Sequence, residues 1–289
     1  MNNVATSLIY LFTSCAILIF AKWLYMKFLK YDMYKEIKSE NYTGIVPYCG
    51  FLFGNVAILA GAFIGPDTYT VFIKEYLYYI TYAIIGVFLL LFSGFVAEKA
   101  ILHKFNNTDE IVRDRNMGTA AVYFGIYVAS GLIISACVTG DTTLTLGKFH
   151  GLISTFIYYL LGIVFLVIFA KIHDKLTPYS LLEEIENDNA AVGISFGGHI
   201  IAIGIILMKA TVGDMGTWQQ SAITYLIDLS AIILLLPSIR FVLDRIIAKG
   251  INISQGIRSN NIATGLGEAF VIVAFALLIF FMIDFTSVI

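Results

Sequence analysis

The chain has 289 residues, of which 59% are hydrophobic and 13% charged, and its formal net charge is −2. Soluble domains are about 45–50% apolar and about 25% charged, and nucleic-acid-binding domains carry an excess of basic residues. The composition therefore excludes an ordinary soluble domain, and the charge gives no basis for nucleic-acid binding. A mean hydropathy of +0.86, concentrated in long runs, indicates a polytopic membrane protein embedded in a lipid bilayer.

Eight apolar segments follow one another along the chain. Each is about 20–24 residues long, enough for a helix to cross a hydrocarbon core of about 30 Å. The segments do not alternate in polarity, as the strands of a membrane barrel would. We predict an all-α polytopic membrane protein with eight transmembrane helices, at 4–26, 43–65, 77–97, 117–139, 151–171, 190–212, 221–243 and 262–284.

The basic residues lie mostly on one side of these segments. Of the 18 Lys and Arg, only Lys74, Lys148 and Lys209 belong to the side that follows the even-numbered segments, which leaves 15 for the other side. Cytoplasmic connections carry the excess of basic residues. The odd-numbered connections are therefore predicted in the cytoplasm, with the N-terminus and the C-terminus outside.

The four odd-numbered connections end alike, in "YKEIKSENYTG", "DEIVRDRNMGTA", "LEEIENDNAAVG" and "QGIRSNNIATG". Each has an Asn just before the next segment, and the successive Asn residues are 75, 73 and 72 positions apart: Asn41, Asn116, Asn189 and Asn261. Regular spacing predicts four units of two helices, and an even number of helices makes all units point the same way. We expect one membrane domain, 1–289, with units at approximately 1–70, 71–145, 146–217 and 218–289.

The pattern "EIKSEN" ahead of a Gly-bearing helix, and most clearly "EIENDNAAVGISFGGHIIAIGI", resembles the YjfL-like family of bacterial inner-membrane proteins, catalogued as domain of unknown function 350. The fourth unit departs from the pattern, with Gly256 where the others tend to be acidic and Glu268 further along the helix. The resemblance implies a membrane architecture in a bacterial inner membrane. It implies no catalytic or binding residues.

The repeated residues have a structural explanation. Asn is a preferred N-cap because its side chain accepts a hydrogen bond from a free amide of the first turn, so the four Asn are predicted helix caps. Positions 2, 6, 9 and 13 after each Asn share one helix face, which is rich in small residues that let helices approach closely in lipid. We predict that the even-numbered helices form a tightly packed inner layer, with packing positions that include Gly50, Gly54, Gly125 and Gly198.

A second face of the even-numbered helices carries positions 7 and 14 after each Asn. Glu268 is at position 7, and an ionisable group at membrane depth is costly and usually marks function. A structural alternative is a protonated or hydrogen-bonded acid held by a Tyr or by a helix N-terminus, whose dipole favours an acid. If the four units surround a central axis, this face lines a cavity. The first hypothesis is a channel- or transporter-like bundle with a polar site formed by Glu268, Tyr48, Tyr123, Asn55 and Ser130.

Lys209 and Asp228 are further polar residues within the apolar segments. They flank the short connection between the sixth and seventh segments, so we predict an ion pair between them. A structural role for this pair is favoured over a transport site.

Enzyme chemistry finds little support in the sequence. The three cysteines and four histidines are scattered, without the spacing of a metal site or of a catalytic or nucleotide-binding motif. We therefore predict no enzyme activity, no metal and no cofactor. The second hypothesis is a non-transporting accessory protein of an envelope or stress-response complex, which presents its cytoplasmic connections to a membrane or cytoplasmic protein partner. The sequence leaves open whether the four units close a ring in one chain or open onto a second copy as a homo-oligomer.

Overall fold

The structure is a computed structural model that describes residues 3–65, 71–139, 150–212, 219, 222–223, 225–227 and 252–282. Seven helices in this part are long and apolar enough to cross a membrane. They match seven of the predicted segments, and the remaining one, 221–243, lies largely outside the described residues. The all-α polytopic fold is therefore confirmed, with long helices α1 (Asn3–Phe28), α3 (Val46–Ile64), α4 (Phe72–Val96), α6 (Met117–Thr139), α8 (His150–Leu176), α10 (Ala190–Thr211) and α13 (Ile262–Met282).

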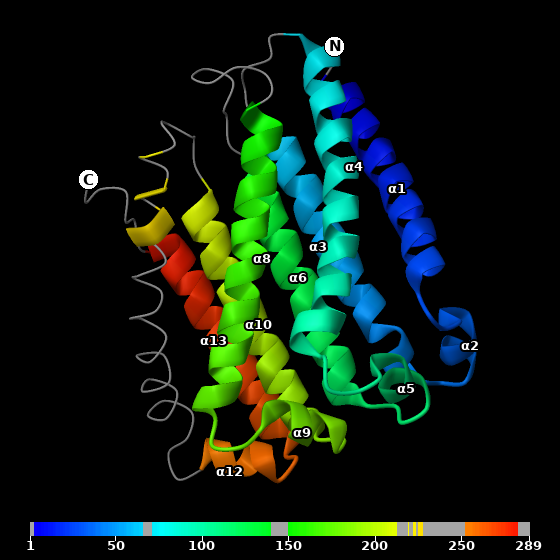
Figure 1. The fold of residues 1–289 in the computed structure, drawn as a ribbon. Coiled ribbons are helices and arrows are strands. Elements are labelled where there is room, and N and C mark those ends of the chain that lie inside the picture. Colours follow the sequence, from blue (N-terminus) through cyan, green and yellow to red (C-terminus); the bar gives the residue numbers. More distant parts are fainter. Residues whose placement is uncertain are drawn as a thin grey trace.

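Short helices gather at one end of the bundle (Figure 1). They hold the charged connections, and we call this end the charged side. Each short α-helix is followed closely by an inner helix that runs away from the charged side, so the units are parallel and the internal repeat is confirmed. The short elements are α2 (Met33–Lys38), η1 (a 3-10 helix, Tyr42–Gly44), η2 (a π-helix, Ala97–Ile101), α5 (Asn107–Val112), α9 (Leu181–Glu186) and α12 (Ile253–Arg258).

The four inner helices form a row. Helix α3 packs on α6, α6 on α10 and α10 on α13, and these are the most extensive contacts in the described part of the chain. In Figure 1 the same order runs across the view from blue α3 to red α13. A closed ring would need an equally extensive contact between α3 and α13, which the described residues do not make. The arrangement around a central axis considered from the sequence is therefore wrong.

Backbone contact holds the row together. A Cβ atom added to Gly50 would lie 2.6 Å from Cα of Phe124, and one added to Gly125 would lie 2.6 Å from the carbonyl oxygen of Gly197. On Gly198 it would lie 2.6 Å from Cα of Ala269. Helices in lipid gain stability from such close approach, because packing and not hydrophobicity holds them together. The predicted packing positions, Gly54 included, all lie at these contacts.

The other long helices cover one side of the row. Helix α4 packs against both α3 and α6, and α8 packs against both α6 and α10, so each lies over the groove between two inner helices. Helix α1 packs on α3 and α4 at the first end of the row. The middle inner helices α6 and α10 are consequently the most buried of the long helices, while α1 and α13 are the least buried.

Candidate functional site

The repeated Asn residues brace the charged side. The side-chain oxygens of Asn116, Asn189 and Asn261 accept hydrogen bonds from backbone N–H groups in the first turns of α6, α10 and α13, at Thr119, Val192 and Thr264. The oxygen of Asn41 accepts one from Thr43 in η1, the 3-10 helix that leads into α3. This is the geometry of a helix N-cap. The residue before each Asn has a left-handed backbone, with φ between 55° and 61°, at Glu40, Arg115, Asp188 and Asn260. The shared conformation places all four Asn equivalently, including the one in the divergent fourth unit.

Three of the four Asn also connect neighbouring units. The Asn116 amide donates 2.8 Å to a carboxylate oxygen of Glu110 and 2.5 Å to the carbonyl oxygen of Ile185, in the next unit. Asn41 makes the same two kinds of bond to Glu36 and Ile111, and Asn189 to Glu184 and Arg258. In the fourth unit the acid is replaced by Gly256. The Asn residues therefore do more than cap, because they tie each unit to the one after it.

Glu110 leads to a first prediction, on pH dependence. Burial raises the pKa of Glu110, against the lowering effect of the Asn116 amide. An acid with a raised pKa in the folded state contributes stability that is lost as pH rises through that pKa. We expect Glu110→Gln, which keeps an oxygen acceptor for Asn116, to be as stable as the parent in acid and more stable at neutral pH. Thermal unfolding at both pH values tests this.

The matched control is Glu183→Gln. Glu183 is exposed and pairs with Lys104 at the protein surface, where an ion pair contributes about 0–1 kcal/mol. Its substitution should not raise the stability at neutral pH. A Glu110→Gln protein that is less stable than the parent at neutral pH would contradict the prediction.

Glu268 is held by the neighbouring inner helix. Its carboxylate accepts a hydrogen bond from the hydroxyl of Ser195 in α10. One turn along α10, Nδ1 of His199 donates to the carbonyl oxygen of Ser195 at 2.9 Å, and the His199 ring centroid lies 4.3 Å from that of His173 in α8. The acid thus has a hydroxyl partner, but this partner is a serine and not the tyrosine of the structural alternative.

The predicted polar site around Glu268 is not a single cluster. Tyr48 and Asn55 lie in α3 and Tyr123 and Ser130 in α6, whereas Glu268 lies in α13 at the other end of the row. The row separates them because the extensive contacts between inner helices join only immediate neighbours, α3 with α6, α6 with α10 and α10 with α13. Asn55 donates to the carbonyl oxygen of Phe51 at 2.8 Å, and the hydroxyl of Ser130 is buried with no partner among the described residues.

The predicted ion pair between Lys209 and Asp228 has one member outside the described residues, Asp228. The Lys209 ammonium lies 5.6 Å from the ring centroid of Phe280 in α13. This is a cation–π contact across the α10–α13 interface. The pair itself stays a prediction.

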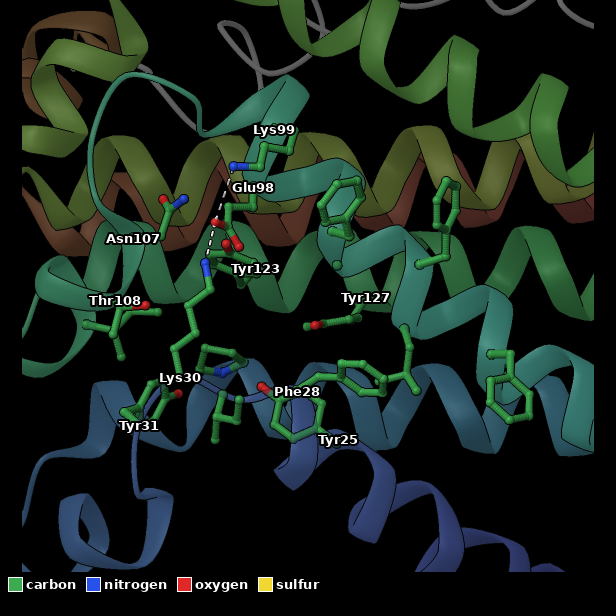
Figure 2. Close-up of a pocket in the computed structure, with 18 residues that line it drawn as sticks. Tyr25, Phe28, Lys30, Tyr31, Glu98, Lys99, Asn107, Thr108, Tyr123 and Tyr127 are labelled. Atoms are coloured by element: carbon green, nitrogen blue, oxygen red, sulfur yellow. Dashed lines mark hydrogen bonds and ion pairs between the residues drawn. The ribbon is translucent and has the colours of Figure 1, made fainter.

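A pocket of about 610 Å³ opens on the charged side between α1, α4 and α6. Its lining is mostly apolar and aromatic, and it includes the tyrosines Tyr25, Tyr31, Tyr123 and Tyr127 (Figure 2). Tyr123 and Tyr127, one turn apart on α6, both line the pocket, and the Tyr127 hydroxyl lies against Gly94 of α4. Further apolar or aromatic lining residues are Phe28, Phe88, Leu91, Phe92 and Phe95.

Charged residues stand at one end of this pocket. The Lys30 ammonium lies 2.5 Å from Oε1 of Glu98, and the Lys99 ammonium lies 3.9 Å from the same oxygen (Figure 2). Two cations against one carboxylate give this end a positive excess. Beside them Tyr31 donates to the carbonyl oxygen of Gly44 at 2.7 Å, and burial raises the pKa of Tyr31, which keeps it a neutral donor.

Asn107 is the most informative polar residue of the pocket. It is buried, and its amide donates to the carbonyl oxygen of Leu102 at 3.0 Å. Its side-chain oxygen finds no donor among the described residues. A buried acceptor without a partner costs about 1–3 kcal/mol. Asn107 thus brings an unsatisfied, buried acceptor to the wall of the pocket.

The equivalent place in the next unit is closed. Position 7 after each Asn is Tyr123 in the second unit and Phe196 in the third. Phe196 lines a cavity of only about 30 Å³, and the ring of His173 stacks on it with centroids 5.7 Å apart. Position 7 therefore faces a pocket in both the second and the third unit.

Most residues of the large pocket were missed in the sequence. Lys30 and Lys99 count there only among the basic residues of the connections, and Glu98 and Asn107 are not singled out. The available signal was the pair Tyr123 and Tyr127, spaced four apart on a helix whose other positions are mostly small or aliphatic.

Comparisons with known proteins agree with the architecture. The family described as "Domain of Unknown Function (DUF350)" matches residues 1–138 and again 148–283, and each matched stretch holds two of the four units. An Aquifex aeolicus (strain VF5) protein named "UPF0719 transmembrane protein" is 25% identical over 253 residues, which cover 86% of this chain and 89% of the relative. No solved structure matches.

Proposed function

Because the chain belongs to the DUF350 family of membrane proteins, for which the family description gives no activity, we propose a function from the pocket: binding of a phospholipid. The observation that carries the proposal is the buried, unpartnered oxygen of Asn107 in the wall of a pocket that also holds two lysines. It calls for a ligand that brings a hydrogen-bond donor together with an anionic group.

The rest of the pocket matches an amphiphile. Lipid-binding pockets need an apolar wall for hydrocarbon and a few placed polar groups for the headgroup. Phe28, Phe88 and Phe92 supply the wall, and Lys30 and Lys99 supply cations for a phosphate. A headgroup ammonium or hydroxyl would donate to Asn107. The ammonium group of phosphatidylethanolamine and the hydroxyl groups of phosphatidylglycerol are such donors, whereas the quaternary ammonium of phosphatidylcholine has no hydrogen to donate.

The proposal includes a location and an orientation. We place the charged side in the cytoplasm of a bacterial cell, with the protein in the inner membrane and the N-terminus outside, on the strength of the basic connections. The pocket then takes lipid from the cytoplasmic leaflet. No chemistry on the ligand is required, so the role is one of binding and not of an enzyme.

Lipid binding suits both hypotheses drawn from the sequence. A transporter-like protein would move the bound lipid, and an accessory protein would only hold it. An axial channel through the row has less support, because α3, α6 and α10 approach at backbone distance along the described length. Movement of a fluorescent phospholipid between leaflets of proteoliposomes distinguishes the two roles, and unchanged leaflet asymmetry would count against transport.

The binding test compares lipids in a neutral detergent. We expect phosphatidylglycerol and phosphatidylethanolamine to raise the thermal midpoint of the purified chain, and phosphatidylcholine to raise it much less, because it cannot donate to Asn107. Inorganic phosphate alone should have little effect, since it leaves the aromatic wall unused. Equal shifts with phosphatidylcholine and phosphatidylglycerol would overturn the proposed headgroup selectivity.

Lysine variants locate the site. We expect the double variant Lys30→Gln/Lys99→Gln to bind phosphatidylglycerol about tenfold more weakly, the loss of one charge-assisted contact being worth about 1.4 kcal/mol or more. The matched control is Lys35→Gln/Lys38→Gln, which removes the same charge from exposed positions of α2 outside the pocket. Similar weakening in both double variants would show only a general attraction of anionic lipid to the charged side.

A further inference from the structure

Each inner helix uses two different faces for its two neighbours. We call the face toward the following unit the leading face, with positions 9 and 13 after the Asn, and the face toward the preceding unit the trailing face, with positions 8 and 15. Gly50 and Gly54 on the leading face of α3 meet Phe124 and Gly131 on the trailing face of α6. The same pairing recurs between α6 and α10, at Gly125 with Gly197 and at Ala129 with Gly204. The interfaces between successive inner helices therefore use the same pairs of positions.

The leading face of α13 has no inner helix against it. Phe270, at position 9, is 72% exposed, and Ala274, at position 13, is exposed as well. Gly267 has no atom within 4 Å of an added Cβ, whereas the residues at its position in the other units are buried: Pro47, Val122 and Ser195. The described outer helices α4 and α8 lie over grooves between inner helices and do not cover this face of α13.

The trailing face of α3, at the other end of the row, likewise has no inner helix against it. Val56, at position 15, is 49% exposed, and Cys49, at position 8, is half-buried. Helix α1, which lies at this end, is among the least buried of the long helices. Helix α4 packs against α3 of the preceding unit as well as α6 of its own unit. Helix α1 has no inner helix of a preceding unit to pack against.

On the charged side, too, contacts that recur between units are missing at the two ends of the row. Asn41, Asn116 and Asn189 each donate to a carbonyl group of the following unit, while among the described residues Asn261 only caps α13. At the other end of the row Ile37 is 43% exposed. Its counterparts in the later units are buried beneath the preceding unit, at Ile111, Ile185 and Ile257.

We propose that a second copy of this chain docks on α13, with the trailing face of its α3 against the leading face of α13 and its Ile37 carbonyl near Asn261. The contact continues the repeated interface from one chain to the next. Side-chain sizes fit this order, because large Phe270 would face small Cys49, just as small Gly50 faces large Phe124. Such a head-to-tail contact produces a closed ring or an open chain of copies.

The pairing of Phe270 with Cys49 provides a direct test. In a Cys15→Ala/Cys137→Ala background that keeps the native Cys49, we expect Phe270→Cys to give disulfide-linked dimers and larger species when membranes are oxidised. Phe270 is exposed, so its replacement should leave the fold of the single chain intact. Reducing agent should return all species to the monomer on a denaturing gel.

Two controls make the outcome specific. Ile172→Cys in the same background places a thiol at an exposed position of α8, away from both ends of the row, and should give only random collisions. Phe270→Cys/Cys49→Ala should give no link. Cross-linking no greater than with Ile172→Cys would overturn the proposal and indicate a lipid-covered edge. Dimers that persist without Cys49 would overturn it as well, because they require two α13 helices to face each other.

Discussion

Replacing Gly125 by alanine is expected to force α6 and α10 apart and to destabilise the folded chain by about 3 kcal/mol, the upper end for overpacking of a close-packed interior. The added methyl group would lie 2.6 Å from the carbonyl oxygen and 2.9 Å from Cα of Gly197. Both are backbone atoms, so no side-chain rotation relieves the overlap. Thermal unfolding in one detergent, followed by the loss of monodisperse protein, measures the effect.

The matched control for Gly125→Ala is Gly267→Ala in α13. This position is also a glycine inside a long apolar helix, but nothing lies within 4 Å of an added Cβ. Alanine is favoured over glycine in a helix by about 0.5–1 kcal/mol, so the control should be slightly more stable than the parent. Equal losses at the two positions would contradict the close approach of α6 and α10.

The second large effect is expected for Asn116→Ala. Asn116 is buried and makes three hydrogen bonds, as a cap for the N–H of Thr119 and as a donor to Glu110 and Ile185. Its removal leaves buried polar groups without partners, at about 1–3 kcal/mol each, and removes a cap worth about 1 kcal/mol. We expect a loss of about 3–5 kcal/mol, measured by thermal or denaturant unfolding.

Asn261→Ala separates capping from the connection between units. Asn261 caps α13 through the N–H of Thr264, yet it is exposed and bonds to no following unit within the described part of the chain. Its substitution should therefore cost only the cap, about 1 kcal/mol. If Asn116→Ala costs no more than Asn261→Ala, the bonds from Asn116 to Glu110 and Ile185 contribute nothing measurable.

Much of the fold was predictable because it depends on local patterns. Apolar length fixed the seven long helices that the structure describes, and the spacing of the four Asn residues revealed the repeat. The small residues at Gly50, Gly54, Gly125 and Gly198 predicted close packing, since glycine on an apolar helix leaves room for a neighbouring backbone. These inferences need only the residues within one unit.

The order of the inner helices was not predicted, because only one of their two contact faces was recognised. At about 100° per residue, positions 9 and 13 and positions 8 and 15 lie on faces roughly 130° apart. A square ring of four helices needs faces about 90° apart, so the wider angle favours a row. The small residues of the second face, such as Gly131 and Gly204, were available in the sequence.

The pocket was beyond sequence reasoning for a different reason. Its walls come from α1, α4 and α6, which belong to two units, and its key residue Asn107 lies in a connection. Periodicity relates equivalent residues of different units, but it does not show which non-equivalent residues meet. Tyr123 was selected for its position on the helix, and the structure supplied its neighbours Tyr25 and Lys30.

The arrangement of the inner helices in a row affects how such proteins can gain or lose repeat units during evolution. In a ring, every helix must be present before the last contact forms, so adding or losing a unit breaks the closure. In a row, an added pair of helices needs to pack only on the last pair at the end of the row. A two-unit stretch, such as either of the stretches matched at 1–138 and 148–283, can thus be duplicated or deleted in one genetic step while the remaining contacts are kept. Chains with different even numbers of units are therefore expected to share one geometry, with specialisation, such as the open pocket of the second unit, confined to single units.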